Sequence, residues 1–131
     1  MKHILPILIL LAACGSSDTE VQNKTEVESV PVKQETIADG EFISNYDDGS
    51  VKLTGTIVNG QRSGTWTSYH RNGNKASENE YSNGLLNGKT VSYYEDGTIR
   101  YIGYYTNDEK AGVWQFFNSD GTEAQTENYS E

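Results

Sequence analysis

Residues able to do acid–base, nucleophilic or metal chemistry are sparse in this 131-residue chain. His3 lies in an apolar N-terminal stretch, and His70 directly precedes an Arg-Asn-Gly turn, where we expect an exposed loop side chain. One histidine in the body of the chain supplies neither a zinc site nor a catalytic triad. We therefore expect no enzyme, no cofactor and no metal site.

The carboxylates that stand out have a structural explanation. A glycine follows each of three aspartates, Asp48, Asp96 and Asp120. Asp-Gly favours a turn, which explains the repeated aspartate. The alternatives are calcium binding or carboxylate catalysis. Glu78 and Glu80 fall on one face of one predicted strand. Because a glycosidase needs two carboxylates facing each other across a cleft, this pair does not predict one.

Cys14 is the one residue whose surroundings predict a covalent modification. Residues 1–13 begin with Lys2 and His3 and continue with an apolar run, which is typical of an export signal. The run is too short to cross a bilayer as a helix, which takes about 20 residues. Leu11-Ala12-Ala13-Cys14 resembles the lipobox of bacterial lipoproteins. The resemblance implies cleavage before Cys14, its lipidation and a location at the cell envelope; the alternative is a plain signal peptide followed by an incidental cysteine.

Residues 14–39 read as a lipidated cysteine followed by a disordered tether, since they are rich in Ser, Thr, Glu, Gln and Lys and hold no aromatic residue. The whole chain has a formal charge of −9. An acidic surface repels nucleic acid and anionic lipid headgroups. We therefore exclude nucleic acid as a partner and expect contact with the membrane only through the lipid on Cys14.

From Gly40 to the C-terminus the chain repeats with a 24-residue period. One series of glycines is Gly40, Gly64, Gly88 and Gly112, and a second, preceded each time by Asp or Asn, is Gly49, Gly73, Gly97 and Gly121. Asx-Gly favours a type I′ hairpin turn. A second turn follows at Asn59-Gly60, Asn83-Gly84 and Asn107-Asp108, and a short connection leads from it to the next unit.

The segments between these turns are rich in β-branched and aromatic residues and predict strands at residues 65–69, 90–94, 99–105 and 113–117. We therefore expect residues 40–131 to be an all-β domain. It would be an antiparallel meander of MORN-like hairpin repeats, with four 24-residue units in an elongated, twisted single-layer sheet. The last strand carries Glu123, Gln125 and Glu127, which suit a protected edge.

The comparison with MORN repeats rests on particular motifs, and the closest resemblance is to the variant found in antitoxin-like bacterial proteins. Residues 101–108 are similar to the MORN family's Tyr-x-Gly-x-aromatic-x-Asn-Gly core, and residues 53–60 are a weaker copy. The variant's Gly-x-Trp-x-x-Tyr pattern corresponds to residues 64–69 and 112–117. The chain departs from the family pattern at three places: Asn79 and Glu127 replace the central glycine, and Thr90 replaces the tryptophan. The resemblance therefore supports the family fold more strongly than a family binding site.

Aromatic residues recur at fixed places in the unit and should form rows across the sheet. The rows are either core or a partly exposed binding strip. Trp66 and Tyr69 should lie on opposite faces because side chains alternate along a strand. The candidate binding aromatics are Trp66, Tyr69, Tyr93, Tyr94, Tyr104, Trp114 and Phe117.

The sequence therefore favours a lipid-anchored, non-enzymatic binding or scaffold module that docks a protein partner on its repeat sheet. One alternative, implied by the MORN-variant resemblance, is an antitoxin or immunity protein. The other is a glycan or cell-wall binder, because residues 112–121 somewhat resemble choline-binding repeats. Such repeats need closely paired aromatics in every unit to cage a cation, and only Tyr93-Tyr94 and Phe116-Phe117 are so paired.

Overall fold

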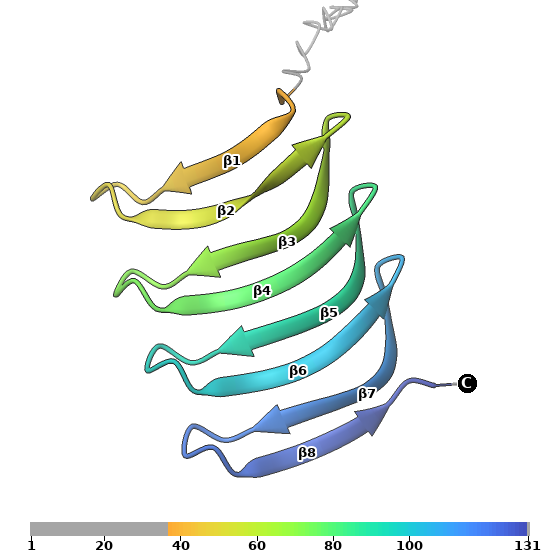
Figure 1. The fold of residues 1–131 in the computed structure, drawn as a ribbon. Helices are drawn as coiled ribbons and strands as arrows, with labels where there is room; N and C mark the ends of the chain where they lie inside the picture. The colour runs from red at the N-terminus through yellow and green to blue at the C-terminus, as the bar shows by residue number, and fades with distance from the viewer. Residues whose placement is uncertain (1–36, 131) are drawn as a thin grey trace, which may run out of the picture. The chain divides into compact units, whose positions relative to one another are not determined.

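A computed structural model describes residues 37–130, which form one antiparallel sheet of eight strands in chain order (Figure 1). The predicted all-β meander of hairpin repeats is confirmed. The predicted export signal, Cys14 and most of the predicted tether fall at residues 1–36, outside the described residues. The described residues contain no helix long and apolar enough to cross a bilayer. The strands are β1 (Gly40–Asn45), β2 (Val51–Val58), β3 (Gln61–Tyr69), β4 (Lys75–Ser82), β5 (Leu85–Tyr93), β6 (Ile99–Thr106), β7 (Glu109–Phe117) and β8 (Glu123–Asn128).

Two kinds of turn alternate along the sheet and stack in separate rows at its two sides (Figure 1). The turns after β2, β4 and β6 are tight loops of two residues; Asn59 and Gly60, for example, have φ values of 51° and 73°, and Val58 pairs with Gln61. Positive φ at both residues is the mark of a type I′ hairpin. The sequence predicts turns at all three of these places.

The turns after β1, β3, β5 and β7 differ from the prediction. In residues 46–50 only Gly49 has positive φ, at 86°, and its N–H donates to the Tyr46 carbonyl oxygen at 2.9 Å. Asp48 accepts bonds from the N–H of Ser50 at 2.9 Å and from its hydroxyl at 2.5 Å. The type I′ prediction for these turns is wrong because Asp48 keeps negative φ and uses its carboxylate to close the loop.

The strands also extend further than predicted. The sequence predicts residues 61–64 as a connecting segment, yet β3 begins at Gln61 and passes through Gly64, where φ is 67°. Between the pairs Thr54–Thr67 and Thr56–Ser63, one residue of β2 faces three of β3. This bulge bends the strand, and β7 repeats it at Gly112.

The structure shows a longer, 48-residue period superimposed on the 24-residue one. Gly40 and Gly88 share a φ of 126°, whereas Gly64 and Gly112 have φ values of 67° and 60°. Their side-chain surroundings repeat in the same way, as described below. Neighbouring units are therefore not interchangeable, and the sheet consists of two similar double units.

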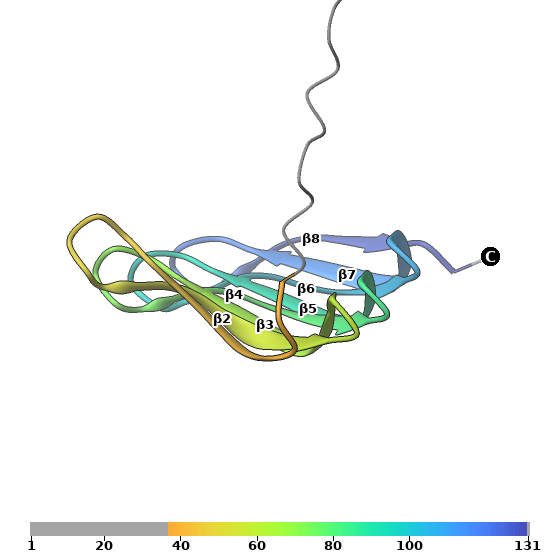
Figure 2. The same cartoon turned by 90° about the horizontal axis from the view of Figure 1, so that it is seen from above.

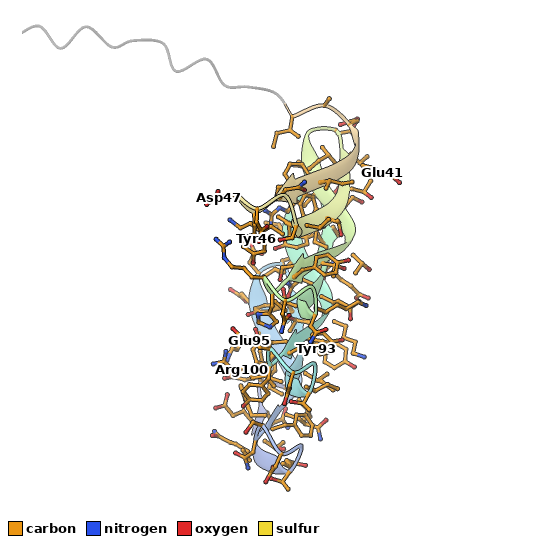
Figure 3. All side chains as sticks on the ribbon, turned by 90° about the vertical axis from the view of Figure 1, so that its left-hand side faces the viewer. Glu41, Tyr46, Asp47, Tyr93, Glu95 and Arg100 are labelled. Carbon is orange, nitrogen blue, oxygen red and sulfur yellow. The ribbon has the colours of Figure 1, made fainter. Side chains whose placement is uncertain are left out.

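The sheet is one layer thick and curved when viewed along its edge (Figure 2). Directly paired residues share a face, so the register divides the side chains into two sets. The aromatic face carries Phe42, Trp66, Tyr81, Tyr101, Tyr105, Trp114, Phe116 and Tyr129. The opposite face carries Glu41, Ile43, Thr67, Glu78, Val91, Tyr93, Ile102 and Tyr104. In Figure 3, Glu41 and Tyr93 project to the right-hand side of the sheet and Asp47 and Arg100 to the left.

Candidate functional site: the aromatic face

The two tryptophans are the most buried large side chains of the aromatic face, each 2% exposed. Trp66 lies flat over Gly55 of the neighbouring strand. A Cβ added at Gly55 would come within 2.2 Å of Trp66 Cδ2, so only glycine permits this close approach. The indole Nε1–H of Trp66 donates to the Thr56 carbonyl oxygen at 3.2 Å. Trp66 is therefore core rather than an exposed anchor.

A cation and two further rings complete the cluster around Trp66. The Arg62 guanidinium carbon lies 4.3 Å from the Trp66 ring centroid, and Arg62 Nη1 donates to the Tyr81 hydroxyl at 3.1 Å. The Phe42 and Tyr81 rings lie 5.2 Å and 6.2 Å from that of Trp66. The guanidinium is held by cation–π and edge contacts, which fix the rings in place while Phe42 and Tyr81 stay half-exposed.

The same cluster recurs two units later, with Gly103, Trp114, Lys110 and Tyr129 in corresponding places. Lys110 Nζ lies 4.4 Å from the Trp114 ring centroid and 3.0 Å from the Tyr129 hydroxyl oxygen. Its bond to that hydroxyl raises the pKa of Lys110, so the ammonium stays charged. Tyr101, Tyr105 and Phe116 surround this tryptophan at 5.6, 5.1 and 6.2 Å between centroids. Four strand spacings separate the tryptophans, about 19 Å along the sheet.

A polar joint separates the two clusters. Here Asn79 stands where Gly55 and Gly103 stand, and Thr90 stands where Trp66 and Trp114 stand. Thr90 is 1% exposed, and its hydroxyl donates to Asn79 Oδ1 at 2.5 Å. The two departures from the repeat are therefore one compensated exchange, because an asparagine side chain occupies the space that an indole would need.

Four of the predicted binding aromatics, Tyr69, Tyr93, Tyr104 and Phe117, lie on the opposite face and so do not join Trp66 and Trp114. Tyr104 is 46% exposed, and the other three are half-buried. The Tyr93 hydroxyl donates to Glu78 Oε2 at 2.6 Å. Burial, together with this bond, raises the pKa of Tyr93 to about 12.

Glu78 and Glu80 share this opposite face, as expected, beside a cavity of about 220 Å³ that Lys89 and Val91 also line. The Lys75 ammonium, 2.6 Å away, and the Tyr93 hydroxyl lower the pKa of Glu78. Glu80 accepts the N–H of Lys89 at 2.7 Å. Both carboxylates of β4 are thus already hydrogen-bonded, Glu78 to Lys75 and Tyr93 and Glu80 to the backbone of β5. Within the described residues, no three His, Cys, Asp or Glu side chains form a group able to hold a metal ion.

Tyr94, the remaining predicted aromatic, belongs to a row of turn residues that tie each unit to the next. Its hydroxyl donates to the Phe117 carbonyl oxygen at 2.8 Å, and Tyr46 bonds the Tyr69 carbonyl in the same way at 2.7 Å. His70 occupies the equivalent place, with Nε2 at 3.1 Å from the Tyr93 carbonyl oxygen. The expectation of an exposed loop histidine is wrong, because this contact between units half-buries the imidazole.

Sequence reasoning expected rows of aromatic residues, and Trp66 and Trp114 do lie on one face, but it did not foresee that Gly55, Arg62 and their counterparts complete the clusters. A signal for them was present, because the members of the two clusters correspond at a spacing of two units. The corresponding pairs are Gly55 and Gly103, Arg62 and Lys110, Trp66 and Trp114, and Tyr81 and Tyr129.

Comparison with protein families agrees with this geometry. The model of the MORN repeat variant matches residues 62–83 and 86–107. Two adjacent hairpins of the chain are therefore similar to the MORN repeat variant. Each matched stretch covers most of one hairpin, β3–β4 for the first and β5–β6 for the second. No curated protein matches the chain.

Proposed function

We propose that this protein is a non-enzymatic docking module that binds a protein partner on the aromatic face of its sheet. The observation that carries the proposal is the pair of matching clusters on that face, each with a buried tryptophan, a cation held over it and half-exposed rings around it. Aromatic residues and arginine are the side chains most enriched where protein interfaces are energetically important. Their positions are preorganised, which lowers the entropic cost of binding.

The separation of the clusters favours a macromolecular partner over a small ligand. A contact that engages both clusters extends about 19 Å along the sheet, a span suited to a typical protein interface, which buries about 800 Å² per partner. The hydroxyl and amide groups of the joint between them already bond each other, as in the 2.7 Å contact between Ser68 and Ser77. The joint therefore offers few free polar groups for sugar recognition.

We further propose that the module is held at the bacterial cell envelope by lipid on Cys14. This part rests on the sequence alone: the short apolar segment, the Leu-Ala-Ala-Cys motif and the absence of a second cysteine in the chain. Two or more acyl chains anchor a protein stably. The sheet would then bind a partner at the envelope while the predicted tether connects it to the lipid on Cys14.

Site-specific photo-crosslinking in the intact envelope tests both parts. A benzophenone amino acid replaces Tyr129 on the aromatic face or, as the matched control, Tyr104 on the opposite face; the two tyrosines are 39% and 46% exposed. We expect one specific protein adduct from position 129 and none from position 104. Tyr129→Ala should weaken the complex about 30-fold, because truncation of an interface hot spot costs about 2 kcal/mol or more. Tyr104→Ala should leave the complex unchanged.

The outcomes separate the alternatives. Adducts only from position 104 would refute docking on the aromatic face, and retention on purified peptidoglycan that Tyr129→Ala abolishes would replace the protein partner with a glycan. A toxin as the crosslinked protein would make the docking an immunity function. Cys14→Ser should release the chain from the membrane fraction; continued attachment would refute the anchor.

A further inference from the structure

The two outer strands of the sheet differ in how they meet a neighbouring strand. β8 presents Glu123, Gln125 and Glu127, and charged side chains of this kind discourage edge-to-edge pairing. β1 carries one charged residue, Glu41, beside Phe42 and Ile43. Within the described residues, β1 pairs only with β2. Among the described strands its other edge has no partner, and it lacks the protective charges found at the far end.

The side chains of β1 show what a missing neighbour exposes. Ile43 is 61% exposed, whereas Val91, which holds the same position two units later in β5, is 7% exposed. Both occupy the opposite face, but β5 has a paired strand on each side. The aliphatic position that is core in the middle of the sheet is therefore uncovered at β1.

The sequence directly before β1 departs from the repeat. In later units a turn N–H donates to a backbone carbonyl of the preceding turn region, from Gly84 to Arg62 at 3.0 Å and from Asp108 to Leu86 at 2.9 Å. Gly60 instead donates to the Asp39 carboxylate at 2.9 Å. In the sequence, Glu35-Thr36 holds the place of the Asn-Gly turn, and a β-branched threonine is poorly suited to the positive φ of that turn.

Pairing of β1 with β8 of another molecule is unfavourable for an electrostatic reason. Such a stack would place the Glu127 carboxylate opposite the Phe42 ring. The carboxylate would lose hydration there without gaining a charged partner. Open head-to-tail fibres are therefore disfavoured, and pairing of β1 with a copy of itself remains, since a two-fold arrangement closes after two chains.

We propose that β1 pairs antiparallel with β1 of a second copy, with Ile43 opposite its own counterpart. This register places Glu41 opposite Asn45 and Phe42 opposite Ser44, so it brings no like charges together. A register shifted by two residues would instead set Glu41 against Ile43. The two-fold axis is perpendicular to the sheet, so the aromatic faces of both copies form one continuous surface.

Cysteine crosslinking of the full chain in a Cys14→Ser background tests the register. Directly opposed residues have Cα atoms about 4.5–5.5 Å apart, within disulfide range. Ile43→Cys should form a disulfide-linked dimer upon mild oxidation, whereas Phe42→Cys and Ser44→Cys should crosslink only when the two variants are mixed. Thr126→Cys in β8 is the matched edge control and should stay monomeric.

Sedimentation of the same chain supplies a second measurement. Ile43→Lys should reduce the observed mass from that of two chains to that of one, and Val113→Lys, an exposed β-branched residue on an inner strand, should leave the dimer intact. A monomeric parent chain would overturn the proposal, as would crosslinking through Thr126→Cys. An intramolecular disulfide between Ile43→Cys and Val30→Cys in the preceding segment would also overturn it. None of these results depends on the docking partner.

Discussion

At the scale of single residues, the glycine–tryptophan and asparagine–threonine pairs are alternative ways to fill one position between neighbouring units. Gly55→Asn alone would force the Trp66 ring out of place, and such overpacking typically costs about 1–3 kcal/mol. Trp66→Thr alone leaves a cavity at a cost of about 3–5 kcal/mol. The double variant recreates the Asn79–Thr90 pair, with its 2.5 Å hydrogen bond. We expect it to lose less stability than the sum of the single variants, with a coupling of about 0.5–3 kcal/mol in urea unfolding.

The control for this cycle combines Gly55→Asn with Trp114→Thr. Trp114 faces Gly103 in a different part of the sheet, so these two changes should add independently. If the stability losses of the single variants simply add in both cycles, asparagine and threonine do not compensate for each other at the joint.

At the scale of the elements, the boundary between β4 and β5 depends on polar contacts more than its neighbours do, and this makes it sensitive to alkaline pH. The Tyr93–Glu78 bond crosses it, and the pKa of Tyr93 is raised to about 12 by burial and by that bond. A raised pKa means that folding favours the neutral phenol. The stabilisation is therefore complete below pH about 10 and is lost as the pH rises towards 12.

We expect the wild-type free energy of unfolding to fall more steeply than that of Tyr93→Phe over this interval. Urea unfolding at several pH values from 8 to about 12 measures the difference. The matched control, Tyr104→Phe, removes an exposed hydroxyl from β6 and should follow the wild-type curve. Equal slopes for Tyr93→Phe and wild type would contradict the role of this bond.

The elements also show how far the sequence could be interpreted. The two glycine series were enough to predict four hairpin units, because each series recurs once per unit. Only the series that begins with Gly49 lies in turns, whereas the series that begins with Gly40 lies in strands. They could not separate the two turn types, since Asx-Gly occurs in both. The choice depends on whether the Asx side chain bonds within the loop, as those of Asp48 and Asn72 do. The aromatic face was only partly predicted, because Arg62 and Tyr81 meet Trp66 through the pairing register of β3 and β4.

At the scale of the whole molecule, the repeat that matters for stacking is the double unit rather than the single unit. In a linear array each unit contacts only its neighbours, so stability depends on whether adjoining units match. A second copy of residues 64–111 inserted after Ala111 preserves every match, because Gly103 then meets the inserted Trp66 and the inserted Gly103 meets Trp114. We expect this variant to fold with a higher urea midpoint and a larger m value than wild type, since it buries more surface.

The matched comparison is a shorter insertion, residues 64–87 repeated after Asn87. It keeps the single-unit period and both turn types, yet it sets Asn79 against the inserted Trp66. A side chain at this position collides with the indole, as the 2.2 Å approach at Gly55 shows. We therefore expect a lower urea midpoint than wild type despite the added strands. If both insertions stabilised the protein equally, units would be interchangeable and the double unit would have no energetic meaning. The predicted difference instead makes the length of this sheet variable only in steps of two units, each step adding one complete aromatic cluster to the docking face.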